Sequence, residues 1–266
     1  MSGFGQYSTG PRLGPAGSWD QASLIPRAPD AAIVSEPTLL DVVVAHKGVL
    51  RWRCHTKGRA AHSSQPQLGD NAIYRLAPAV KAIEDLNARL PDDPFLGKGT
   101  CTVTWIGSES PSLCAVPDQA ELHIDRRLTR GETQRSALTE IESALATVGV
   151  EAEVYTPVYE EKAWTGLVYP MDKYYPTWVL EKDHPAVSGL QAAASRTIGG
   201  EAELSRWNFS TNGVAIMGLH GIPCIGFGPG DEPMAHAPNE RVPVDHLVKA
   251  SAFYALFALR MSGVGS

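Results

Sequence analysis

The sequence predicts a mixed α/β protein in which a smaller α+β domain interrupts a larger α/β domain. Three observations support this prediction. Two short apolar runs come early, half-buried strand patterns alternate with helical patterns over about 49–158, and helical patterns later flank the apolar run "GIPCIGF". Alternating strands belong to antiparallel sheets with one solvated face, whereas continuous apolar strands are buried on both faces. The change from one pattern to the other therefore indicates two kinds of domain.

The composition is that of a globular protein and excludes several function classes. The chain has 266 residues, is 43% hydrophobic and carries a net charge of −6, which argues against sequence-independent binding of nucleic acid. No apolar run approaches the ~18 residues of a transmembrane helix, and the first residues lack the pattern of a signal peptide. The four cysteines are scattered and form no C-x-x-C pair, so we expect a cytoplasmic protein without a disulfide scaffold.

The early segments predict a loop followed by two buried strands. Residues 1–28 are rich in Gly, Pro and Ser and are expected to be loop or disordered. The runs "AAIV" (31–34) and "DVVVA" (41–45) are predicted to be strands around a turn, because Pro37 cannot donate to a strand ladder there.

The middle region predicts the order strand–helix–strand–strand–helix–strand. In "VLRWRCHT" (49–56) apolar and polar residues alternate, and a helical stripe follows with Asp70 or Asn71 as the N-cap. Strands over 100–106 and 120–125, a helix over 137–148 and a final strand complete an antiparallel sheet with helices on one face. Downstream we expect a helix near 186–199, a buried strand at "GIPCIGF" and a C-terminal helix.

Glu36 and His62 are the first candidates for chemistry. Glu36 lies in the tight turn "SEPT" after a buried strand, where α/β sheets place ligands; a turn-capping carboxylate is the alternative. His62 lies among small residues in "GRAAHSSQP", where an imidazole could stabilise an oxyanion; a solvated loop histidine is the alternative.

Arg127 and His236 are the later candidates. Arg126 and Arg127 are expected on opposite faces of a strand, and either could clamp a carboxylate or form an ordinary surface ion pair. The loop "GFGPG" is not a G-x-G-x-x-G fingerprint, so it gives weak support for a dinucleotide site, but its glycines permit close approach to a small ligand. His236 follows this loop in "MAHAPNE", as a metal ligand, a catalytic group or a structural histidine.

Four segments, taken in order, resemble the dinuclear metallohydrolases that include acetylornithine deacetylase, succinyl-diaminopimelate desuccinylase, aminoacylase and glutamate carboxypeptidase. They are "AAIVSEPTLLDVVVAHKG", "GRAAHSSQPQLGDNAI", "AVPDQAELHIDRRLTRGET" and "GIPCIGFGPGDEPMAHAPNE". The segments "GLVYPMDKYYPTWVLEKDHP" and "FSTNGVAIMG" are most similar to one branch of that family, the YgeY branch. That branch is linked to selenium metabolism.

The resemblance implies a fold and a partner. It implies a zinc-peptidase-like catalytic α/β domain over 29–47 and 164–266, with a ferredoxin-like lid and dimerisation domain inserted over 48–163. The partner implied is a second copy of the chain, bound through the lid.

The resemblance also implies roles for single residues. Glu36 and His236 would be ligands of two different metals, which could be Zn, Co or Mn. His62 would steady an oxyanion in the partner's active site, and Arg127 would hold a substrate carboxylate. Gly228 and Gly230 would face the substrate.

Two departures from the family pattern stand out. Cys114 occupies "CAVP" where many relatives have Asn, which removes an amide donor. Upstream of Glu36 there is no H-x-D motif and no Glu-Glu pair; the adjacent Glu160 and Glu161 come in the wrong order. We therefore expect the chain to lack the N-terminal part of the catalytic domain.

Two functions remain open at the level of the sequence. The first is a metal-dependent hydrolase of a C–N bond in an N-acyl amino acid, dipeptide or related small amide. The second is a non-catalytic remnant that dimerises or binds a ligand. The two-ligand set favours little or no metal in the chain as written, because a zinc ion takes three or four ligands.

Overall fold

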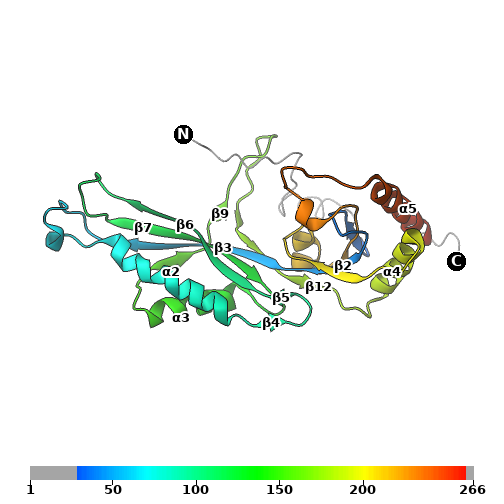
Figure 1. Cartoon of the computed structure of the whole chain (residues 1–266), viewed down its shortest axis with the longest axis horizontal. Coiled ribbons are helices and arrows are strands. Elements are labelled where there is room, and N and C mark those ends of the chain that lie inside the picture. The colour runs from blue at the N-terminus through cyan, green and yellow to red at the C-terminus, as the bar shows by residue number, and fades with distance from the viewer. Residues whose placement is uncertain (1–28, 262–266) are drawn as a thin grey trace. The chain divides into compact units, whose positions relative to one another are not determined.

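The computed structural model describes residues 29–261, and the side chains to residue 259. The chain forms two compact units (Figure 1). Unit 2 comprises Lys47–Glu160 and Pro170–Thr177, and unit 1 comprises the described residues before Lys47, Glu161–Tyr169 and the residues from Trp178 onward. The fold class is confirmed as mixed α/β with an inserted domain. No helix in the described part of the chain is long and apolar enough to cross a membrane.

Unit 2 is built on one antiparallel sheet with two helices on one face (Figure 1). The sheet order is β8–β3–β7–β6, with β11 also beside β3. The bounds are β3 Gly48–Lys57, α2 Ala72–Arg89, β6 Thr100–Glu109, β7 Gln119–Leu128, α3 Gln134–Thr147, β8 Glu153–Tyr155 and β11 Tyr174–Tyr175. This is the ferredoxin-like order that the sequence predicts.

The alternation in β7 decides which face of the sheet is covered. Every second residue from Ala120 to Leu128 is buried and the residues between them are partly exposed. The buried side packs on α2 and α3 in one apolar cluster that includes Trp52, Leu76 and Ile141. The other side of the sheet, which we call the open face, carries the polar residues of β3 and β7.

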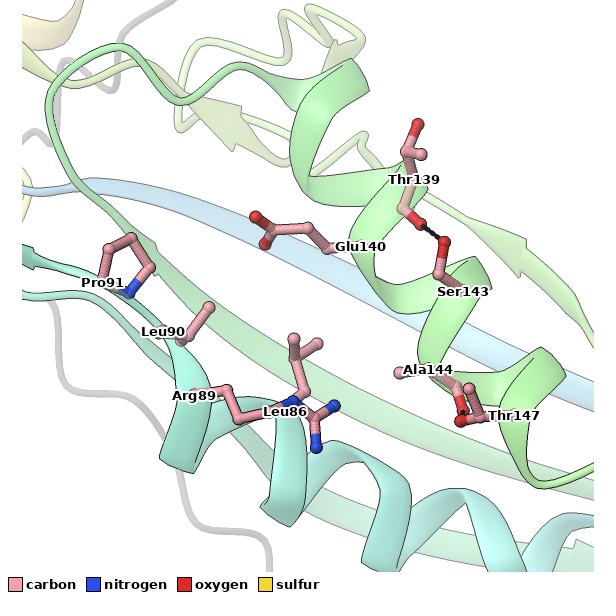
Figure 2. A pocket seen from close by; sticks show the side chains of 9 residues that line it. All are labelled: Leu86, Arg89, Leu90, Pro91, Thr139, Glu140, Ser143, Ala144 and Thr147. Carbon is pink, nitrogen blue, oxygen red and sulfur yellow. Dashed lines mark hydrogen bonds between the residues drawn. The ribbon is translucent and has the colours of Figure 1, made fainter.

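The two helices of unit 2 begin at well-defined caps. Asn71, one of the two predicted N-caps, accepts hydrogen bonds from the backbone N–H groups of Ile73 and Tyr74 at 2.9 and 3.3 Å. Thr133 and Ser136 form a capping box at the start of α3, which supplies partners for N–H groups that a helix leaves unpaired. The second helix therefore begins earlier than the sequence predicts. Between the helices a groove is lined by Leu86, Leu90, Glu140 and Ala144 among others (Figure 2).

Two small hairpins complete unit 2. They are β4 Asp92–Asp93 with β5 Gly97–Lys98, and β9 Val158–Tyr159 with β10 Met171–Asp172. The second hairpin was not predicted. The segment that connects its two strands includes Glu161–Tyr169 of unit 1, where Trp164 is 86% exposed.

Unit 1 is a mixed sheet in the order β1–β14–β2–β12, with β13 also beside β2. β1 (Ala32–Val34) runs parallel to β14 (Cys224–Gly226), which is the buried strand predicted at "GIPCIGF". β2 (Val42–His46) is entirely buried. The remaining elements are β12 Trp178–Val179, α4 Pro185–Ile198, β13 Leu204–Trp207, the π-helix η2 Val214–Leu219, the 3₁₀-helix η3 Glu232–Met234 and α5 Val244–Met261.

Candidate active site

The segment that carries Glu36 is clasped to the glycine loop in unit 1. Because β1 and β14 are parallel neighbours, the loops after them leave the sheet at the same edge. The N–H groups of Leu39 and Leu40 donate to the carbonyls of Gly230 and Gly228 at 2.8 and 3.2 Å. Thr38 reinforces the clasp, because its hydroxyl both donates to the Gly228 carbonyl at 3.1 Å and accepts from the Gly228 N–H at 3.0 Å.

This clasp explains why residue 228 is glycine. A Cβ atom at Gly228 would lie 2.3 Å from the backbone oxygen of Glu36. Gly230 is required for a different reason, since its φ of +87° lies in the left-handed region. Gly228 therefore allows the Glu36 turn to pack against the loop that leads to His236. The sequence predicts close approach to a small ligand at these glycines, whereas the structure shows close approach of Gly228 to the chain's own backbone.

His236 lies on an irregular turn after η3. Its φ is +63°, which is uncommon for a residue other than glycine. Its backbone N–H donates to the Glu240 carboxylate at 3.2 Å, and the residue is exposed. Burial raises the pKa of Glu232, earlier in the same segment. Glu36 and His236 are thus carried by the two segments that follow β1 and β14.

The described residues fall short of a complete metal centre. Within residues 29–261, no group of three or more His, Cys, Asp or Glu side chains could hold a metal ion. One carboxylate and one imidazole are fewer than the three or four ligands that zinc takes.

His62 lies in unit 2, on an exposed loop that is hydrogen-bonded to the loop of Cys114. The Ser63 N–H donates to the Cys114 carbonyl at 2.8 Å, and His62 forms a β-bridge with Ala115. The Nδ1 atom of His62 accepts from the Ser64 N–H at 3.2 Å. In the neutral ring the proton then sits on Nε2, which leaves an N–H donor for a ligand.

The cysteines divide into one exposed and three buried thiols. Cys114 is exposed, whereas burial raises the pKa of the Cys54, Cys101 and Cys224 thiols to about 12. No pair among the four is a disulfide. The buried thiols therefore stay protonated and act as core side chains.

Arg126 and Arg127 lie on opposite faces of β7, as predicted. The Arg126 side chain is 1% exposed and contacts the Glu132 and Glu140 carboxylates under α3. The Arg127 side chain is 31% exposed and lies on the open face, where its Nε is 2.7 Å from Asp125 Oδ1. Arg126 thus joins β7 to the carboxylates of Glu132 and α3, and Arg127 lies partly exposed on the open face.

The open face also contains two residues that the sequence analysis did not single out. Arg51 of β3 pairs in register with Asp125 of β7, and the Arg51 Nε lies 3.7 Å from Asp125 Oδ2. Alternation placed each residue on a polar face. The register that joins two strands about 70 residues apart is not visible in either local pattern.

Comparison with known proteins identifies the domain in unit 2. Residues 44–153 match the family model described as a peptidase dimerisation domain. The chain is 46% identical over 231 residues to the protein YgeY of Escherichia coli strain K12, covering 87% of this chain and 57% of the relative. The chain is related to the M20 peptidases. The predicted resemblance is thereby confirmed.

A further relative is similar in sequence, and a solved structure is similar in fold. A putative succinyl-diaminopimelate desuccinylase of Mycobacterium tuberculosis is 27% identical, with 83% of this chain and 56% of the relative covered. The crystal structure of a tripeptidase from Staphylococcus aureus superposes with a TM-score of 0.67 at 19% identity, covering 93% of this chain and 61% of that one. At that identity the superposition shows the fold alone. The chain spans just over half the length of the curated relatives that it matches.

Proposed function

We propose that this chain belongs to a metal-dependent hydrolase that cleaves a C–N bond in an N-acyl amino acid, dipeptide or related small amide. The observation that carries the proposal is the clasp at the ends of β1 and β14, which holds Glu36 beside the loop leading to His236 in an M20-related chain. The sheet edge where parallel strands end is where α/β proteins bind ligands.

In this proposal Glu36 and His236 each supply one ligand to a centre of two Zn, Co or Mn ions. The other ligands would come from outside the described residues, which hold too few for a complete centre. Gly228 and Gly230 would border the substrate, and the Arg127 guanidinium would bind its carboxylate. The His62 Nε2–H would donate to the oxyanion that forms when the amide carbonyl is attacked.

The positions of His62 and Arg127 support a site shared between two subunits. His62 bridges to Ala115, just before β7 begins, whereas Arg127 lies near the end of that strand. Extended strand rises roughly 3.3 Å per residue, so β7 from Gln119 to Arg127 alone covers roughly 25 Å. Ala115, which pairs with His62, comes before that strand. A small amide cannot span that distance, so His62 and Arg127 would serve different active sites. We propose that His62 serves the site of a second copy.

Metal content and hydrolysis test this function together. The full chain is loaded with Zn²⁺, Co²⁺ or Mn²⁺, and metal is counted by mass spectrometry. Release of free amino acid is then measured from N-acetyl and N-succinyl amino acids and from dipeptides. Loss of a residue that only hydrogen-bonds to a metal ligand lowers activity roughly 10–100-fold. We expect E36Q and H236A, which remove ligands themselves, each to lower the rate of hydrolysis by more than that.

The competing function predicts a different result. A chain that binds well under one metal per subunit and hydrolyses none of these compounds is the non-catalytic module that dimerises or binds a ligand. The observation that favours this second function is that the described residues contain no group of three or more possible metal ligands.

A further inference from the structure

Arg127 on the open face is held by a carboxylate of its own strand. Asp125 and Arg127 are two residues apart on β7 and so face the same side of the sheet. Two contacts join them: Nε to Oδ1 at 2.7 Å and Nη2 to Oδ2 at 3.4 Å. Both contacts use the side of the guanidinium nearest the chain, and Nη1 takes part in neither.

Asp125 also lies near a cation on the neighbouring strand. Arg51 lies opposite it in register, with its Nε 3.7 Å from Oδ2. The Asp125 side chain is 17% exposed, which is less than either arginine. One carboxylate between two guanidiniums leaves a net positive charge at the cluster.

We propose that Asp125 is a positioning residue that fixes the Arg127 guanidinium side-on, so that its outer edge is presented to the carboxylate of the ligand. The proposal rests on the proposed role of Arg127. An arginine held in this way loses less conformational freedom when it binds, and bidentate binding of a carboxylate depends on the orientation of the guanidinium plane.

The opposite effect of Asp125 would be repulsion of the ligand. A carboxylate near the binding edge disfavours a second one, so neutralising Asp125 would then strengthen binding. Arg51 offsets part of this repulsion because its guanidinium also lies near Asp125. We therefore expect orientation to outweigh repulsion, and neutralisation to weaken binding.

The test compares two probes that differ in one charge. N-acetylglycine carries a carboxylate, and N-acetylglycinamide has a neutral amide in its place. Binding of each to the full chain is measured by NMR titration at about 0.15 M salt, and the ratio of the two affinities gives the preference for the carboxylate. The wild type should prefer the acid, and R127Q should lose that preference.

The variants of Asp125 then separate position from charge. We expect D125N to lower the preference about tenfold, as for a misaligned charge-assisted hydrogen bond, and D125E to recover part of it. The matched control is E121Q, because Glu121 pairs with Arg53 at 2.9 Å on the same face. It removes the same charge away from Arg127 and should leave the preference unchanged.

The outcomes distinguish this inference from the proposed function. If R127Q loses the preference but D125N keeps or strengthens it, Asp125 does not position Arg127. If the wild type shows no preference for the acid, the proposed role of Arg127 fails and this inference fails with it. A direct readout is the Arg127 Nε–H resonance, which should lose its distinct shift in D125N and keep it in E121Q.

Discussion

Two adjacent arginines in unit 2 have different physical tasks. Arg126 is buried beneath α3, where its guanidinium contacts two carboxylates and donates to the Arg127 carbonyl at 3.2 Å. Glu132 in turn accepts from the Thr129 backbone and hydroxyl at 2.5 and 2.7 Å. The network ties the end of β7 to the start of α3, so removal of Arg126 leaves the partly exposed Glu132 and Glu140 carboxylates without their cation.

The pair predicts unequal losses of stability. R126A should lower the free energy of unfolding by about 1–3 kcal/mol, because it leaves the Glu132 and Glu140 carboxylates without their buried partner. R127A should cost about 0–1 kcal/mol, as for an exposed ion pair. Urea titration followed by circular dichroism measures both, and equal losses would contradict the assignment of the two faces.

At the scale of single residues, the sequence separates what is periodic from what is not. The alternation of Leu122 and Ile124 with polar neighbours predicts opposite faces for Arg126 and Arg127. The contact between Arg51 and Asp125 depends on strand register, and the positive φ of His236 depends on its loop. No local pattern contains that information.

At the scale of the elements, the clasp between the loops after β1 and β14 leaves no space for a side chain at Gly228. G228A would force a Cβ against the Glu36 carbonyl, and the nearest atoms that it meets are backbone atoms, which cannot rotate away as a flexible side chain can. We expect G228A to lower the free energy of unfolding by about 1–3 kcal/mol or more.

The matched control for the clasp is G189A. Gly189 lies within α4, and nothing lies within 4 Å of an added Cβ. Alanine in a helix interior should raise stability by about 0.5–1 kcal/mol. Thermal unfolding of the two variants distinguishes the effects, and a neutral G228A would refute the clasp.

Element types are predicted better from the sequence than element ends. Long periodic segments such as α2 and β3 are predicted, because burial imposes their period on the sequence. α3 begins three residues before the predicted start, since Thr133 caps it through Ser136. The short strands β9 to β13 were missed because two to four residues carry no readable period.

For the whole molecule, the exposed edge of the unit 2 sheet predicts self-association. β6 is a ten-residue edge strand with Trp105 and Ile106 about half exposed. A long edge with apolar side chains is a template for pairing with another chain. It lies in the segment that matches a peptidase dimerisation domain.

We therefore expect a homodimer joined through β6. Analytical ultracentrifugation should show a dimer for the wild type and a shift toward monomer for I106K, because a charge on an edge strand opposes pairing. V148K is the control, since Val148 is 41% exposed but lies at the end of α3. A wild type that stays monomeric at high concentration would exclude the dimer.

The first and last segments of unit 2 lie next to each other, which is the arrangement that tolerates insertion of a domain into another protein. Gly48 at its start donates its N–H to the Thr177 hydroxyl at its end, at 3.0 Å. A polypeptide of residues 47–177 would contain all of unit 2 together with the Glu161–Tyr169 segment of unit 1. Its closely spaced termini would suit circular permutation or insertion into a loop of another protein. In evolutionary terms, such a module can be gained or exchanged in one insertion event without rethreading the recipient.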